Sequence, residues 1–163
     1  MRPLVKMGLK LGAFSFLTLT SLTYAQDAAA PSPEEHAQQA VELRQSVFKL
    51  IGWSFGPVGG MLKNKVPFDA AVAAKSAARI ETLAPMIGEA FQTDTSKFQL
   101  KTKAREGIWT NKSDFAAKND DLVKAAAALS AAAKGGDKKA TMQAAAAVGK
   151  ACGACHDNFR DKT

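Results

Sequence analysis

The chain has 163 residues, enough for one domain of ordinary size, and carries 22 Lys and Arg against 15 Asp and Glu, a formal charge of +7. The basic residues are spread along the chain and are not interleaved with aromatic side chains, which argues against nucleic-acid binding. Alanine dominates the C-terminal half; it is the best helix former but has little surface to bury in a core. The composition therefore favours helices that leave room for a large apolar cofactor.

Residues 1–25 have the features of a secretory signal peptide. Three basic residues precede an apolar stretch from Leu11 to about Leu22, and Ala25 offers a cleavage site. The alternative, an uncleaved membrane anchor, is weakened because the stretch is shorter than the roughly 20 residues that a bilayer span needs. We therefore expect an exported protein, cleaved near Ala25 and without a membrane span. Cleavage would remove three basic residues and no acidic one, leaving a formal charge of +4.

Residues 26–32 are predicted to form a flexible linker, followed by a helical domain over residues 33–163. Ser32 can cap the first helix, Pro33 suits its first position, and Glu35 completes a capping box. This helix should run to about Met61, with a kink or break at Pro57. Its apolar residues, at steps of three or four, are Leu43, Val47, Ile51, Phe55 and Val58.

Three more helices are expected. The second spans about 68–91 with a kink at Pro85, and a long polar connection follows over 92–110, anchored by Trp109. The third runs over about 112–134, capped by Asn111 or Ser113, and the fourth runs to about Arg160 after Asp137. The face residues of the second helix are Val72, Ser76, Ile80, Leu83, Ile87 and Phe91. No segment alternates with period two, so the pattern predicts an all-α four-helix bundle.

The C-terminal motif Cys152-Gly153-Ala154-Cys155-His156 is the attachment pattern of c-type haem. On a helix, residues three and four apart project from nearly one face, so both thiols and the imidazole would share that face. The thiols can add to the porphyrin vinyl groups while His156 ligates the iron.

Other uses of the two cysteines have less support from the sequence. A redox disulfide of the thioredoxin type would place the motif beside a strand, and no strand is evident. A structural disulfide suits an exported protein, but helical spacing strains it. A zinc site would lack further Cys ligands, with His36 as the second His of the chain.

These residues carry a family likeness. The segment Arg44–Ile51 in the first helix, the triplet Gly107-Ile108-Trp109 before the third and the motif at the end of the fourth together resemble cytochrome c′, the class II c-type cytochromes. The likeness spans essentially the whole mature chain. It implies a left-handed, antiparallel, up-down-up-down bundle that encloses one covalent haem c, often as a homodimer through the first two helices.

The resemblance also implies roles for individual residues. His156 would be the only protein ligand of the iron, Arg44 and Gln45 would meet the haem propionates, Phe48 would occupy the distal side, and Arg160 the proximal side. From the residues alone, Arg44 could instead be a solvated surface residue, and Arg160 could merely cap the last helix.

Phe48 cannot ligate iron, which favours five-coordinate iron open to diatomic gases, NO and CO rather than O₂. Met61 and Met86 remain candidates for a sixth ligand in a low-spin electron carrier. The family is associated with periplasmic electron transport, so a redox protein is a further expected partner. An enzyme is the weakest hypothesis, because no distal acid–base group accompanies Phe48.

Overall fold

The computed structural model describes residues 30–162, so the expected signal peptide and most of the linker lie outside the described residues. The first helix, α1, spans Pro33–Leu62 and begins as predicted. Ser32 Oγ accepts from the N–H of Glu35 (3.3 Å), and the Glu35 carboxylate accepts from the N–H of Ser32 (2.6 Å). The predicted capping box is therefore confirmed.

The predicted interruption at Pro57 does not end α1, which continues to Leu62. Proline deprives the carbonyl four residues earlier of its donor, and here that carbonyl belongs to Trp53. Both Pro57 and Trp53 are exposed, so this carbonyl lies on the solvent side, where water can replace the lost donor. Proline at a buried position would have had a larger effect.

The second predicted helix, expected to continue with a kink at Pro85, is instead divided in two at that proline. Helix α2 spans Ala70–Leu83, and the short α3 spans Met86–Ala90 after Pro85. Asp69 caps α2 by accepting from the N–H of Val72 (2.9 Å), a cap that the sequence analysis did not identify.

The long connection after α3 contains the short helix α4, Gly107–Thr110, and Trp109 anchors it by donating from Nε1 to the carbonyl of Phe91 (3.1 Å). Helix α5 spans Lys112–Lys134 and α6 spans Lys138–Phe159. Asp137 caps α6 as predicted, whereas Asn111 occupies the cap position of α5 without a side-chain hydrogen bond.

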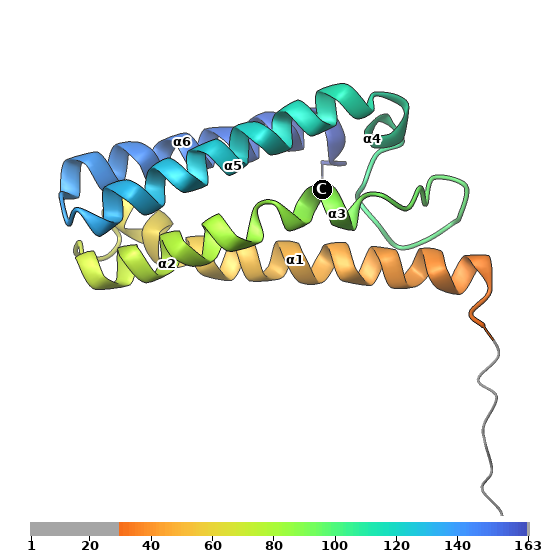
Figure 1. Cartoon of the computed structure of the whole chain (residues 1–163), viewed down its shortest axis with the longest axis horizontal. Helices are drawn as coiled ribbons and strands as arrows, with labels where there is room; N and C mark the ends of the chain where they lie inside the picture. The colour runs from red at the N-terminus through yellow and green to blue at the C-terminus, as the bar shows by residue number, and fades with distance from the viewer. Residues whose placement is uncertain (1–29, 163) are drawn as a thin grey trace, which may run out of the picture. The chain divides into compact units, whose positions relative to one another are not determined.

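The four long helices form an antiparallel bundle, with α5 beside α6 and α1 beside α2 (Figure 1). Helix α2 also packs against α5, and α1 against α6. The all-α four-helix prediction is confirmed; the single extended pairing within residues 30–162 is the isolated bridge between Ala104 and Arg160. None of the helices in this part of the chain has the length and apolarity needed to cross a membrane.

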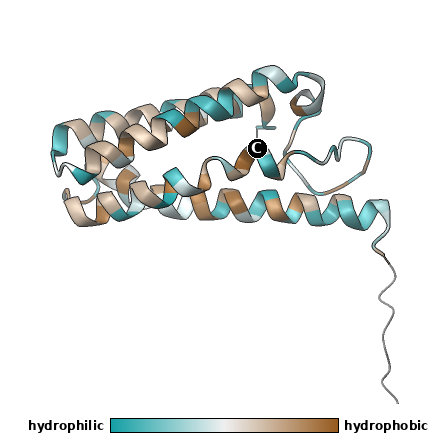
Figure 2. Ribbon diagram, in the orientation of Figure 1, coloured by the Kyte–Doolittle hydropathy of each residue, from teal (hydrophilic) through white to brown (hydrophobic). Residues whose placement is uncertain are grey.

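Small side chains make up much of the core. The fully buried alanines are Ala73, Ala77, Ala84, Ala126 and Ala145, and larger residues such as Ile80, Leu129 and Val148 fill the space between them. Hydrophobic residues alternate with hydrophilic ones along α1, as one buried face requires (Figure 2). Two residues of the predicted apolar faces are instead exposed, Leu43 to 55% and Val72 to 39%.

Candidate functional site

Cys152, Cys155 and His156 lie on the last turns of α6, and all three are half-buried. Both thiols are free, so the cysteines do not form the disulfide weighed above. Burial raises the pKa of both thiols, with the charges of Cys152 and Asp114 adding to the effect at Cys155. Two protonated thiols thus stand one helical turn apart on the face that also carries the imidazole.

Within residues 30–162, no group of three or more His, Cys, Asp or Glu side chains is placed to hold a metal ion. A zinc site built from protein ligands needs three or four such groups. A haem needs fewer protein donors, because the porphyrin itself supplies the four in-plane nitrogens.

Phe48 on α1 faces His156. Their ring centroids are 6.5 Å apart in an edge-on arrangement, and Phe48 is 37% exposed. Phe48 also meets Phe91 edge-on at 6.1 Å, and Phe91 packs on Phe115 at 5.0 Å. The structure therefore brings the predicted distal residue opposite the predicted axial ligand, at the end of an aromatic cluster.

The environment of His156 favours its neutral form. Burial lowers the pKa of the imidazole, and the nearby charge of Arg160 lowers it further, against a smaller opposing effect of Asp157. A neutral imidazole has the lone pair that a metal requires. Arg160 occupies the cap position of α6, and its exposed side chain places Nη1 3.5 Å from His156 Nδ1. Arg160 thus lies at the helix end and close to His156, and its proximal role at a haem stays a prediction.

Arg44 is only 3% exposed, so the alternative of a solvated surface residue is wrong. Its Nε donates to the carbonyl of Ala90 (2.9 Å), its Nη1 to Thr95 Oγ1 (2.7 Å) and its Nη2 to the carbonyl of Thr93. The guanidinium carbon lies 4.6 Å from the ring centroid of Phe91. Three of the five N–H groups of the guanidinium therefore have neutral partners, and two remain for an anion.

Burial lowers the pKa of Arg44, and the charge of Asp94 partly offsets this effect. Gln45, its neighbour, is exposed and donates from Nε2 to the carbonyl of Lys101 (3.1 Å). Both residues therefore bind the connection between α3 and α4. Their predicted contact with haem propionates stays a prediction.

That connection contributes residues which the sequence analysis missed. Thr93 and Thr95 hold Arg44, and Arg105 binds the end of α6. These contacts join residues about fifty positions apart, so periodicity within one helix could not reveal them. The length of the connection was the one indication in the sequence. A polar connection this long is uncommon in a compact domain unless it packs against the rest of the protein or has a functional role.

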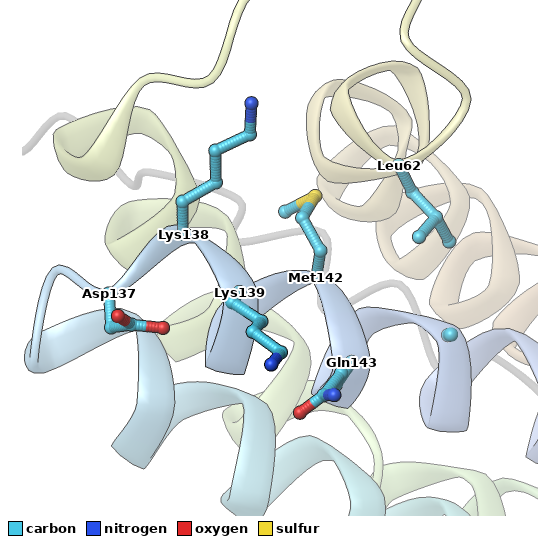
Figure 3. Close-up of a pocket in the computed structure, with 7 residues that line it drawn as sticks. Leu62, Asp137, Lys138, Lys139, Met142 and Gln143 are labelled. Atoms are coloured by element: carbon cyan, nitrogen blue, oxygen red, sulfur yellow. The ribbon is translucent and has the colours of Figure 1, made fainter.

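An open surface groove of about 620 Å³ lies elsewhere (Figure 3). It is lined by Leu62 at the end of α1 and by residues at the start of α6, including Lys138, Lys139 and Met142. From Lys138 to His156 a helix rises about 27 Å. The groove therefore lies at the opposite end of the bundle from the cysteine motif and contains none of the predicted site residues.

The donor set fits a c-type haem. Two protonated thiols at helical spacing, a neutral imidazole on the same face, an opposing aromatic cluster and a buried cation are the groups that such a cofactor requires.

Comparisons with known proteins agree with this assignment of a c-type haem site. A family model described as Cytochrome C' matches residues 39–160. A cytochrome c' from Rubrivivax gelatinosus is 40% identical over 123 residues, covering 76% of this chain and 95% of the relative. A cytochrome c-554 from Cereibacter sphaeroides is 34% identical over 165 residues, covering 99% of each chain.

Two solved structures extend the agreement to the fold. The crystal structure of cytochrome c' from Rubrivivax gelatinosus superposes with a TM-score of 0.72 at 38% identity, covering 77% of this chain and 97% of that one. The nitric oxide complex of a variant of cytochrome c prime from Alcaligenes xylosoxidans superposes with a TM-score of 0.70 at 32% identity, covering 78% and 97%.

Proposed function

This chain belongs to the cytochrome c′ family and carries covalently bound haem c, and on that premise we propose that it is a periplasmic protein whose five-coordinate iron binds NO and CO. Cys152 and Cys155 form the thioether links, and His156 is the axial ligand. Arg44 and Gln45 meet the propionates, Phe48 is the distal wall, and Arg160 lies on the proximal side. No catalytic reaction is part of the proposal.

The observation that carries the proposal is the position of Phe48 opposite His156. A benzyl side chain cannot donate to iron, so the side across from the imidazole has no ligand from this residue. When bound, the haem supplies an iron whose second axial position can accept a diatomic molecule.

Met61 and Met86 are the candidate sixth ligands named above, and Met142 and His36 are two further side chains that could donate to iron. Within residues 30–162, Met61 and Met142 both line surface grooves shared with Lys138, at the far end of the bundle. Met86 is 40% exposed at the start of α3, and His36 is exposed in the first turn of α1. This distribution favours five-coordinate iron over the low-spin alternative.

Phe48 also determines which gases bind. Its ring is apolar and offers no hydrogen bond to a bound O₂, so ligands that bond strongly without such help are favoured. The same ring provides no acid–base group, which is the reason for not proposing a peroxidase or a reductase. The nitric oxide complex of the cytochrome c prime from Alcaligenes xylosoxidans supports the choice of ligand.

The competing function is a six-coordinate, low-spin electron carrier of the same fold. The relatives include proteins named cytochrome c-554 as well as cytochrome c', so family membership alone does not separate the two. The coordination of the iron separates them directly.

A homodimer is also part of the proposal. Helix α1 exposes Leu43 (55%), Leu50 (49%) and Trp53 (62%) at the spacing of a coiled-coil seam. Trp53 lies under the guanidinium of Arg79 on α2, with 4.3 Å between the ring centroid and the guanidinium carbon. An exposed apolar stripe of this kind favours association, here with a second copy of the chain.

The test compares ferric, ferrous and CO-treated spectra of the protein purified from the periplasmic fraction. We expect high-spin spectra that change with CO, no stable complex with O₂, and a mass equal to the chain from residue 26 plus one haem. Phe48→Met is the matched control, because it places a thioether where a sixth ligand would lie and should give a low-spin, CO-insensitive spectrum. A wild-type spectrum that is already low-spin and indifferent to CO would refute the gas-binding proposal.

A further inference from the structure

The C-terminal end of α6 carries the proposed axial ligand and is completed by a residue from another part of the chain. A helix leaves its last four carbonyls without partners in the helical ladder. In α6 the carbonyl of His156 still accepts from the N–H of the cap residue Arg160 (3.2 Å), which leaves the carbonyls of residues 157–159. The other three all accept from Arg105.

Arg105 uses both its side chain and its backbone for these contacts. Its Nη1 donates to the carbonyls of Asp157 (3.1 Å) and Asn158 (3.3 Å), and its backbone N–H donates to the carbonyl of Phe159 (3.1 Å). Its Nε forms an ion pair with Asp161 at 3.0 Å. A cation at this end of a helix also interacts favourably with the helix dipole.

The backbone around Arg105 reinforces the contact. The N–H of Asp161 donates to the carbonyl of Lys103 (2.9 Å), and Ala104 pairs with Arg160 as an isolated antiparallel bridge. Residues 103–105 and 159–161 therefore form one paired unit, which we call the α6 clamp. Helix α4, which follows the clamp, and the end of α6 lie at the same end of the bundle (Figure 1).

We infer that Arg105 is a positioning residue for His156, an inference that rests on the proposed function of this site. The direction of the imidazole relative to the two cysteines is set by the helical backbone of this last turn. Without the side chain of Arg105, the carbonyls of Asp157 and Asn158 lose their donor, and the turn frays as helix ends do, although the backbone N–H of residue 105 still bonds the Phe159 carbonyl. The α6 clamp thus holds His156 against the opposing Phe48.

A simple surface ion pair would not have this effect. The side chains of Arg105 and Asp161 are 36% and 62% exposed, and exposed pairs contribute little to stability. If the ion pair were the whole function of Arg105, removing either partner would have the same small effect. The contacts with the carbonyls make the two residues unequal, because only Arg105 provides them.

The experiment uses the haem-bound protein and compares Arg105→Ala, Arg105→Lys and Asp161→Asn with the wild type. The matched control is Asp137→Ala, which removes the hydrogen bond to the Ala140 N–H (2.6 Å) at the opposite end of α6. The measurements are the iron–imidazole stretching band in resonance Raman spectra of the ferrous protein, and hydrogen exchange of peptides covering residues 150–162 by mass spectrometry.

For Arg105→Ala we expect a broader iron–imidazole band at lower frequency and at least about tenfold faster exchange at the end of α6. Arg105→Lys should lie between this variant and the wild type, because one ammonium cannot reproduce the forked contacts. Asp161→Asn should resemble the wild type. Asp137→Ala should lower the melting temperature while leaving the band unchanged.

The inference is overturned if Arg105→Ala leaves both the band and the exchange rates at wild-type values, or if Asp137→Ala shifts the band as much. Failure of the proposed function has a different signature. A protein without haem, or with a low-spin spectrum indifferent to CO, would refute that function whatever the exchange rates show. If Arg105→Ala does not fold, the other two variants test the inference. A larger change in the band and in the exchange rates for Arg105→Lys than for Asp161→Asn supports it, and equal changes overturn it.

Discussion

Replacing Arg44 by lysine tests whether the buried guanidinium is held by its shape as well as by its charge. The guanidinium makes three hydrogen bonds, two of them to the buried groups Ala90 O and Thr95 Oγ1, and stacks near Phe91 and Trp109 at 4.6 and 5.1 Å. Lysine retains the charge, but its compact ammonium lacks the planar fork and the stacking surface.

The expected cost follows from these contacts. Leaving at least one buried acceptor without its donor costs about 1–3 kcal/mol, and the lost stacking adds about 0.5–2 kcal/mol. We therefore expect Arg44→Lys to lower the free energy of unfolding by about 2–4 kcal/mol. With a urea m-value of about 2 kcal/mol per molar, typical for a small protein, the midpoint of unfolding falls by about 1–2 M.

The assay is urea unfolding of the haem-bound protein, followed by far-ultraviolet circular dichroism. Arg79→Lys is the control, since it removes a guanidinium that lies over the exposed ring of Trp53. An exposed pair of this kind contributes about 0.5–1 kcal/mol, so the control should move the midpoint only slightly. Equal midpoints for Arg44→Lys and Arg79→Lys would show that the buried contacts do not hold Arg44 in the way described.

Three further outcomes are expected. Cys152→Ala or Cys155→Ala should leave the haem attached by one thioether, and the double variant should release all haem to acidic organic solvent, as checked by mass spectrometry. If the proposed homodimer forms, Leu50→Lys should convert it to a monomer in sedimentation velocity without altering the haem spectrum. The pKa of Glu35 is lowered by its hydrogen bonds with Ser32, so its stabilisation is present above the unfolded pKa of about 4.3 and lost as the pH falls through the lower folded value. The melting temperatures of the wild type and Glu35→Gln should therefore differ at pH 7 and converge in acid; a constant difference would contradict this.

The helix boundaries could be predicted where the signal is local. The box between Ser32 and Glu35 and the cap at Asp137 each involve residues three apart, and the structure has both. Pro85 divides the second predicted helix for the same kind of reason. Pro57 did not end α1, because the consequence of a proline depends on whether the carbonyl it frees faces solvent, and sequence alone does not show this.

The apolar faces were predicted less completely. Leu43 and Val72 fit the helical period as well as their buried neighbours do, yet both are exposed. Periodicity identifies apolar positions on a helix without saying what will cover them, and a core and an interface between copies produce the same pattern. The buried positions beside them are often alanines, such as Ala73 and Ala77, which an analysis weighted toward large side chains passes over.

The candidate site also contains one part that could be predicted from local sequence and one part that could not. The two thiols and the imidazole sit within five consecutive residues of one helix, so a short motif specifies their relative directions completely. The contacts around this motif join residues far apart in the chain: Arg105 reaches Asp157 at the end of α6 across 52 positions, and Arg44 reaches Thr95 across 51. Both contacts involve the connection between α3 and α4, which has no periodic pattern because it does not repeat a helical face. The chemistry of attachment is therefore encoded locally, while the order of the turn that carries the proposed axial ligand is inferred to depend on distant contacts. It follows that substitutions in residues 92–106 should alter the spectroscopic properties of the haem without preventing its attachment, whereas replacing both Cys152 and Cys155 should prevent the attachment itself.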